Sequence, residues 1–326
     1  MLYTSKISFP GLGIDEFTVN SIAFTIPGTE IGIAWYAIII TFGMICCIAY
    51  AVLQSRKVGI TIDDVVDFAL FTIPIGVIGA RLYYVIFDND HTYETIIDVF
   101  NIRQGGLAIY GGIIAGALTV LAVSYFKKIN FFAFGDCVAP GVLLAQGIGR
   151  WGNFMNGEAF GGTTDIFIRM GLQNPNTYGR LLYVHPTFLY ESLWNLSGVL
   201  LVYLFSRLVG KKYDGQLILL TFGWYGLGRM FIEGLRSDSL YIGDTNIRVS
   251  QVLAAAIFIV CLGLIIFFAI KKPTKPLYHK PEPVVADGEE KKDSLDELFA
   301  KVKKYFSSKK DGKESEDQTK NDEDNK

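Results

Sequence analysis

The stretch VSQVLAAAIFIVCLGLIIFFAI, residues 249–270, contains no charged side chain. A helix needs about 20 apolar residues to cross the hydrocarbon core of a bilayer, so this stretch is long enough to span one. Because the core offers no water to hydrogen-bond the backbone, an apolar range of this length is expected to be a helix. We therefore expect an all-α polytopic membrane protein with seven transmembrane helices, at 31–53, 65–87, 107–126, 131–151, 186–208, 217–235 and 249–270.

Charged residues are distributed unevenly along the chain, although the formal net charge is only −2. Residues 271–326 hold 28 of the 62 charged side chains, half of them basic and half acidic. This composition predicts a membrane domain over 1–270 and a mostly disordered cytoplasmic tail over 271–326. Within the tail, 294–306 has the spacing of an amphipathic helix, either on the membrane surface or without a fixed partner. The depletion of charge before residue 271 excludes a soluble globule, and no basic surplus points to a nucleic-acid partner.

The loop residues predict the orientation in the membrane. The first, third and fifth connections and the start of the tail are basic, whereas the basic residues of the other connections are interleaved with Asp and Glu. By the positive-inside rule, the N-terminus is expected outside and the C-terminus in the cytoplasm. No removable signal peptide is indicated. The four cysteines avoid the predicted outside loops, so no disulfide framework is indicated either.

Polar side chains occupy the outer parts of several predicted spans. A charge at the bilayer centre costs about 2.5–3.5 kcal/mol, so charges retained inside a membrane usually mark a functional cavity. Tyr225, Arg229 and Glu233 are spaced i, i+4 and i+8, which places them on one helix face. Because guanidinium groups bind phosphate through two parallel hydrogen bonds, the set predicts a phospholipid headgroup site in the outer leaflet. The full set is Tyr36, Arg81, Tyr110, Arg150, Glu191, Tyr225, Arg229 and Glu233.

A structural alternative stays open at this point. Arg229 and Glu233 have the spacing of a helix ion pair. Arg81 and Arg150 are long enough to reach lipid phosphates at the membrane surface without any site. The neighbouring glycines are equally ambiguous: Gly112 and Gly116 have the small-xxx-small spacing of close helix packing, but glycine backbone can also cradle a phosphate.

Five blocks of the sequence resemble the prolipoprotein diacylglyceryl transferase family, bacterial membrane enzymes that attach diacylglycerol to lipoprotein precursors. The blocks occur in the order of the family and cover about residues 30–270. The third is the family signature, and the fifth is nearly as specific. They are GARLYY (79–84), QGGLAIYGG (104–112), GRWGNFMNGEAFG (149–161), HPTFLYE (185–191) and YGLGRMFIEGLR (225–236).

The resemblance implies transfer of the diacylglyceryl group of phosphatidylglycerol to the lipobox Cys thiol of a prolipoprotein. A thioether forms and glycerol phosphate leaves, at the outer leaflet of the bacterial cell membrane, without a metal or cofactor. Arg150 and Arg229 are implied to hold and stabilise the phosphate. The expected catalytic residues are Arg150, Arg229, Tyr110, Glu158 and Glu233. The expected phosphatidylglycerol-binding residues are Arg150, Asn153, Gly161, Tyr36, Tyr225, Arg81 and Arg236.

Tyr110 stands where many members of the family have His. A phenol has a pKa near 10, against about 6.5 for imidazole, which makes it a poor base at neutral pH. Tyr110 is therefore a candidate hydrogen-bond donor to a lipid oxygen, and the proton acceptor is left open between Glu158 and Glu233. Residues 161–184 are expected to form a loop over the outer mouth, because Asn-Pro and Gly interrupt any regular pattern there.

Three other function classes fit less well. A phospholipid acyltransferase of the usual kind needs a His-x-x-x-x-Asp arrangement, which this sequence lacks near the polar set. A transporter predicts repeated interrupted helices and polar groups at the midplane, and neither pattern is found. A retinal-based pump requires a Lys within the last span, and 249–270 contains none.

Overall fold

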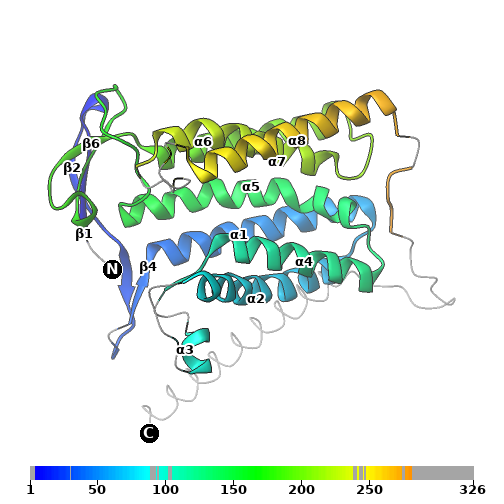
Figure 1. Cartoon of the computed structure of the whole chain (residues 1–326), viewed down its shortest axis with the longest axis horizontal. Helices are drawn as coiled ribbons and strands as arrows, with labels where there is room; N and C mark the ends of the chain where they lie inside the picture. The colour runs from blue at the N-terminus through cyan, green and yellow to red at the C-terminus, as the bar shows by residue number, and fades with distance from the viewer. Residues whose placement is uncertain are drawn as a thin grey trace, which may run out of the picture.

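The computed structural model describes residues 4–29, 31–88, 93, 95–101, 105–237, 241, 245, 247–273 and 276–280. Seven helices of 17 to 26 residues dominate this part of the chain and lie side by side (Figure 1). A short helix, α3 (Ile96–Phe100), lies between the second and third of them. The long helices are α1 (Trp35–Ser55), α2 (Ile62–Phe87), α4 (Ile109–Lys127), α5 (Phe131–Asn156), α6 (Thr187–Leu208), α7 (Gln216–Ile232) and α8 (Val249–Lys271).

Six of these described helices are long and apolar enough to cross a membrane, which confirms a polytopic helical membrane protein. The exception is α7, whose 17 residues continue into a 3-10 helix, Glu233–Leu235. A helix of that length spans about 26 Å, slightly less than the hydrocarbon core of about 30 Å. The seven-span count and the direction of the termini stay predictions.

Helix α5 is the central element of the bundle and packs against α1, α6 and α7. Half of its span is buried, compared with 11% for α1 and α8. The side chain of Asn130 caps its first turn, and Gly157 ends it with a left-handed φ of 58°. The chain therefore reverses direction immediately after Asn156.

Asp136 gives α5 a polar interruption that has a structural reason. Its carboxylate accepts the main-chain N–H groups of Gly215, Leu217 and Ile218 at 2.9–3.0 Å. It also forms an ion pair with Lys211 at 3.1 Å. Because these N–H groups have no partner within the first turn of α7, Asp136 satisfies that helix start and ties α7 to α5.

Helices α2 and α4 approach each other through glycines. Gly112 and Gly116 face α2 at ordinary contact distances, in agreement with their small-xxx-small spacing. The tightest approach is one residue earlier, where a Cβ on Gly111 would lie 2.3 Å from the main-chain oxygen of Gly79. The close packing of this helix pair therefore requires glycine at both positions.

A four-stranded antiparallel sheet caps one end of the bundle, so the expectation of an all-α protein is wrong in this respect (Figure 1). Its strands are ordered β2-β1-β5-β6, and Ile7, Met170 and Leu172 are buried in its core. Two of its strands fall within 161–184, which we expected to be a loop. The strands are β1 (Thr4–Phe9), β2 (Ile14–Asn20), β5 (Met170–Gln173) and β6 (Leu182–Val184).

The sheet is attached to the end of α5. The side-chain amide of Asn174 donates to the main-chain oxygen of Gly157 at 2.8 Å and to the hydroxyl of Ser5 at 3.1 Å. Phe188, in the first turn of α6, completes the apolar core of the sheet. A separate hairpin of β3 (Ile22–Thr25) and β4 (Gly32–Ala34) leads from the sheet into α1.

The described part of the tail returns across the opposite end of the bundle, where it is drawn in orange in Figure 1. Tyr278 packs against the helix ends there, and Lys280 forms an ion pair with Asp64. Residues 276–280, which we call the strap, therefore pack with the helices. The amphipathic helix predicted near 294–306 lies outside the described residues, as does the rest of the tail.

Candidate functional site

The carboxylate of Glu191 is the common partner of three arginines. Its Oε2 lies 2.5 Å from Nη2 of Arg150 and 2.9 Å from Nη1 of Arg229. Its Oε1 lies 3.2 Å from Nη1 of Arg236. Glu191 is only 4% exposed, and its partners come from α5, from α7 and from the end of the 3-10 helix after α7. The packing of three helices therefore assembles this contact.

A second buried carboxylate completes the group. Glu233 is 2% exposed, and its Oε2 lies 2.6 Å from Nη2 of Arg229, the i, i+4 pair expected from the sequence. The guanidinium of Arg248 donates to the main-chain oxygen of Glu233. We call Arg150, Arg229, Arg236, Glu191 and Glu233 the arginine network.

The arginine network gathers three guanidinium groups around two buried carboxylates. Buried charges are unfavourable unless they are paired. Guanidinium groups form two parallel hydrogen bonds to a phosphodiester, so their geometry suits a group of this kind. The network is therefore built to receive an anion.

Polar contacts extend from Arg150 along the last turn of α5. Nη1 of Arg150 donates to Oδ1 of Asn153 at 3.3 Å. The amides of Asn153 and Asn156 both donate to Oε1 of Glu158, at 3.0 and 3.1 Å. The left-handed turn at Gly157 makes these last contacts possible, because it folds Glu158 back towards the helix end.

Tyr36 and Tyr225 lie close to Arg150. Tyr36 interacts electrostatically with both Arg150 and Glu158, and Tyr225 interacts with Arg150. Tyr36 also packs over α5 at Gly152, where a Cβ would lie 2.8 Å from its ring. The structure thus brings both tyrosines to the arginine that the sequence singles out.

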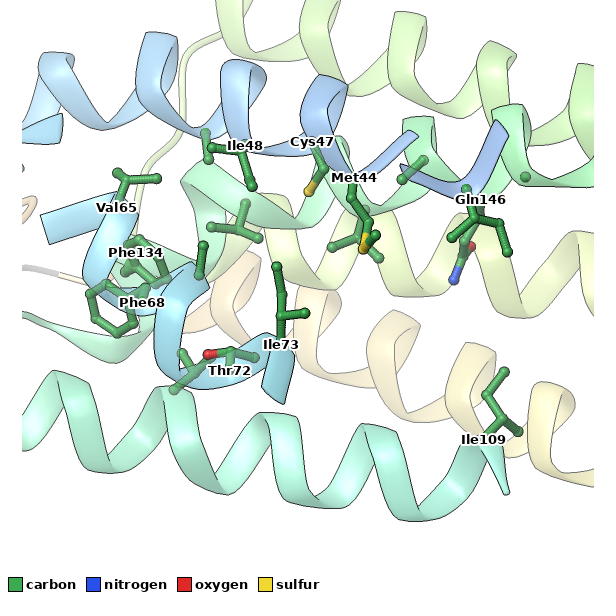
Figure 2. A pocket seen from close by; sticks show the side chains of 18 of the residues that line it. Met44, Cys47, Ile48, Val65, Phe68, Thr72, Ile73, Ile109, Phe134 and Gln146 are labelled. Atoms are coloured by element: carbon green, nitrogen blue, oxygen red, sulfur yellow. The ribbon is translucent and has the colours of Figure 1, made fainter. Parts of the chain in front are cut away.

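A cavity of about 510 Å³ opens beside Arg150 and Asn153, between α1, α2, α4 and α5. Figure 2 shows Gln146 and Ile109 towards one end of it and Phe68 and Phe134 at the other. Along α5 the lining runs from Asn153 to Phe134, which corresponds to about 28 Å of helix. Apart from the residues near Arg150 the walls are almost entirely apolar, so the site joins a charged mouth to a long apolar channel.

Arg81 is held elsewhere. Its guanidinium donates to the main-chain oxygens of Val99, Gly105, Gly106 and Asp98, at 2.8 to 3.1 Å. Arg81 is 3% exposed and fixes the connection between α2 and α4. The structure does not bring it to the arginine network, although the sequence groups it with the substrate-binding residues.

Tyr110 also lies outside the network. It is half-buried in the first turn of α4, next to Ile109, which lines the cavity. The backbone of this turn is fixed to α2, because the N–H of Ala108 donates to the main-chain oxygen of Ala80 at 3.0 Å.

Gly161 packs against the segment that carries Arg236. The two residues pair as an antiparallel bridge. The N–H of Gly161 donates to the main-chain oxygen of His185 at 3.0 Å, and that of Gly162 to Leu235 at 2.8 Å. A Cβ on Gly161 would lie 2.8 Å from the main-chain oxygen of Leu235, so a side chain there would displace the segment that carries Arg236.

The sequence alone did not assign a role to two residues of the site, Glu191 and Arg248. Glu191 was among the polar residues of the spans, but nothing in its spacing indicated that three arginines share it. Arg248 lies 15 residues after Glu233, and its contact depends on how α8 packs on α7. A carboxylate within an apolar span was the one signal for Glu191 that the sequence offered. Within the part of the chain that the structure describes, no three His, Cys, Asp or Glu residues are grouped to hold a metal ion.

Comparison with known proteins gives a consistent result. Residues 21–267 match the family model described as prolipoprotein diacylglyceryl transferase. The phosphatidylglycerol–prolipoprotein diacylglyceryl transferase of Clostridium kluyveri is 44% identical over 245 residues, covering 72% of this chain and 91% of that protein. The enzymes of that name from Clostridioides difficile and Enterococcus faecalis are each 43% identical, covering 72% and 76% of this chain and 90% of each relative.

Proposed function

The chain belongs to the prolipoprotein diacylglyceryl transferase family, and we propose that its arginine network holds the phosphate of phosphatidylglycerol above the apolar cavity. The protein is a transferase that moves the diacylglyceryl group of phosphatidylglycerol to a prolipoprotein, the first step of lipoprotein modification. It is a multi-pass bacterial membrane protein.

One observation carries the assignment of the site: three arginines that share one carboxylate lie at the mouth of a long apolar cavity, which one of them, Arg150, also lines. A phospholipid fits this arrangement, because its negatively charged phosphate is joined to long hydrocarbon chains. Its phosphate would lie against Arg150, which belongs to both the network and the cavity wall, and an acyl chain would extend between α1, α2 and α5. Tyr36, Tyr225 and Asn153 would surround the glycerol region.

The reaction proceeds by attack of the lipobox thiolate on the glyceryl carbon. A carbon–sulfur bond forms, the carbon–oxygen bond to phosphate breaks, and the electron pair leaves with glycerol phosphate. Negative charge therefore grows on the phosphate as the bond breaks. Arg150 and Arg229 stabilise that charge, because fixed guanidinium donors need no reorganisation in the transition state. Arg236 keeps Glu191 in place and thereby orients the other two.

Glu158 is the better of the two candidate proton acceptors. Glu233 is held in an ion pair with Arg229 at 2.6 Å, so its Oε2 is already engaged by a guanidinium group. Glu158 instead accepts from the neutral amides of Asn153 and Asn156. It also interacts electrostatically with Tyr36, which lines the cavity. The substrate thiol has a pKa near 8.5, so a carboxylate together with neighbouring arginines is sufficient help at neutral pH.

The site faces the outer leaflet in this proposal. The arginine network lies at the end of the bundle that carries the sheet, and the basic connections predicted to be cytoplasmic join helix ends at the opposite side. Prolipoprotein would approach from the outside, and phosphatidylglycerol would enter from the bilayer. The tail over 271–326 stays, in this view, on the cytoplasmic side.

The assignment is tested with purified full-length protein, phosphatidylglycerol and a lipobox peptide. We expect a diacylglyceryl thioether on the peptide and an equal amount of glycerol phosphate. A peptide with Ser in place of the lipobox Cys should give neither product. Absence of both products with the Cys peptide, from folded protein, would contradict the proposal.

Gly161→Ala should lower the transfer rate at least tenfold. The added methyl group meets main-chain atoms that cannot rotate away, and overpacking of this kind costs about 1–3 kcal/mol. Gly162→Ala is the matched control, since a Cβ there meets nothing within 4 Å. The measurement is the initial rate of each variant with phosphatidylglycerol and peptide. Equal rates for the two variants would show that Gly161 does not position Arg236.

Tyr110→Phe should retain at least a tenth of the wild-type rate. The phenol lies outside the arginine network and is a weak base, so its loss removes at most a hydrogen bond. Tyr225→Phe, which removes a hydroxyl close to Arg150, is the comparison and should lower the rate more. An inactive Tyr110→Phe enzyme would instead make the phenol an obligatory proton carrier.

A further inference from the structure

The apolar cavity ends at a pair of stacked rings. Phe68 of α2 and Phe134 of α5 have ring centroids 3.7 Å apart and an interplanar angle of 17°. Each is 2% exposed, and both line the cavity at the end remote from Arg150 (Figure 2). The rings therefore separate the channel from the packed core behind them.

The space behind the rings is filled. Ile60 and Ile129 are buried in one cluster with Phe68 and Phe134, and Tyr278 of the strap packs against this cluster. Protein interiors of this kind are close-packed and yield little to an inserted group. The inner end of the cavity is thus a closed wall.

The strap is held to the helix ends at Tyr278 and at Lys280. The N–H of Tyr278 donates to Oδ2 of Asp214 at 2.9 Å, and its hydroxyl donates to the main-chain oxygen of Lys128 at 3.4 Å. Nζ of Lys280 lies 2.5 Å from Oδ2 of Asp64, and its N–H donates to Val58 at 2.8 Å. The family match ends at residue 267. Residues beyond the shared part of the chain therefore close the far side of the wall.

The length of the cavity determines how far an acyl chain can extend before it reaches the two rings. The lining covers about 28 Å of α5, nearly twice the hydrocarbon thickness of one leaflet, which is about 15 Å. An acyl chain that begins below a phosphate at Arg150 can therefore extend far along the cavity. A chain that is too long meets the rings before its glycerol reaches the network.

We propose that Phe68 and Phe134, backed by Tyr278, form a stop that sets the longest acyl chain of the phosphatidylglycerol that the enzyme uses. This inference rests on the proposed function, because it places the phosphate at Arg150. Chains up to the stop leave the glyceryl carbon in position for attack. Each methylene beyond it lifts the glycerol away from the arginines and lowers kcat/KM.

The experiment measures kcat/KM for a series of phosphatidylglycerols whose two saturated acyl chains increase in length. One methylene that a hydrophobic pocket cannot accommodate changes kcat/KM by about 10–200-fold, so the wild type should show a sharp drop beyond a limiting length. Phe134→Ala should move that drop to chains longer by about two methylenes or more. Phe132→Ala is the matched control, because this ring on the same helix is 56% exposed and lies outside the cavity lining.

Two further variants allow the test to be made even if Phe134→Ala does not fold. Phe134→Leu removes the ring with less loss of packing and serves where Phe134→Ala does not fold. Tyr278→Ala lies outside the helices and should shift the drop in the same direction by a smaller amount. An unchanged length profile in both a Phe134 variant and Tyr278→Ala, in enzyme that still transfers diacylglycerol, overturns the stop. Absence of transfer by the wild type at every chain length overturns the proposed function instead, and with it the stop that rests on it.

Discussion

Arg150→Ala is expected to lower the rate of diacylglyceryl transfer about a thousandfold, in protein that still folds and inserts. Arg150 is the one arginine of the network that also lines the cavity, and it pairs with Glu191 at 2.5 Å. Its guanidinium would face the phosphate as charge develops on the leaving group. Removing one such fixed donor costs about 10²–10³ in rate, and a charged fork on a phosphoryl group costs more.

The measurement is the initial rate of thioether formation on a lipobox peptide. Arg150→Lys keeps the charge but not the two parallel donors, so it should recover only a small part of the loss. Arg207→Ala is the control, because Arg207 lies in the last turn of α6, at the other end of that helix from Glu191. A rate for Arg150→Ala within tenfold of the wild type would remove Arg150 from the phosphate site.

Glu191→Gln should lower kcat about a hundredfold and also destabilise the protein. The substitution leaves three arginines without their shared carboxylate, and breaking a buried ion pair on one side costs about 3–5 kcal/mol. Mutual repulsion would then move the guanidinium groups from their positions around the phosphate. Small displacements of such groups are sufficient for large losses in rate.

Thermal unfolding in detergent and kcat with saturating phosphatidylglycerol separate the two effects. Glu16→Gln is the matched control: this glutamate is half exposed on β2 and pairs with the exposed Lys6, a type of contact worth about 0–1 kcal/mol. Glu191→Asp keeps the charge and should restore part of the stability. Wild-type kcat in Glu191→Gln would show that the arginines hold their positions without it.

The helical part of the fold could be predicted from the sequence because a membrane imposes a local rule. Every apolar range had to satisfy its own hydrogen bonds, and six of the predicted ranges coincide with helices that are long and apolar enough to cross a membrane. The sheet obeys no local rule of this kind. Strand β1 pairs Lys6 with Gln173 and Ile7 with Leu172, far away in the chain, and β5 and β6 are only four and three residues long. Such short strands have no periodicity that distinguishes them from a loop.

Within the site, the sequence grouped residues by type and depth, whereas packing decided which of them meet. Arg81 and Arg150 are both arginines within apolar helices, and composition does not separate them. Arg81 has its donors directed to four main-chain oxygens of a neighbouring connection, while Arg150 has a carboxylate and a cavity in front of it. Only the relative positions of the helices distinguish a structural cation from one available to a ligand.

The sequence by itself determined that this chain is a helical membrane protein, which family it resembles, and which arginines and glutamates lie within its spans. These conclusions depend on hydrophobicity and on short motifs, which are properties of neighbouring residues. The tertiary structure alone decided that Glu191 joins three arginines, that Gly161 pairs with Arg236, and that Tyr278 of the strap packs against the cluster of Phe68 and Phe134. Each of these contacts joins separate helices or chain ends, and their energies depend on distances that only the packed bundle sets.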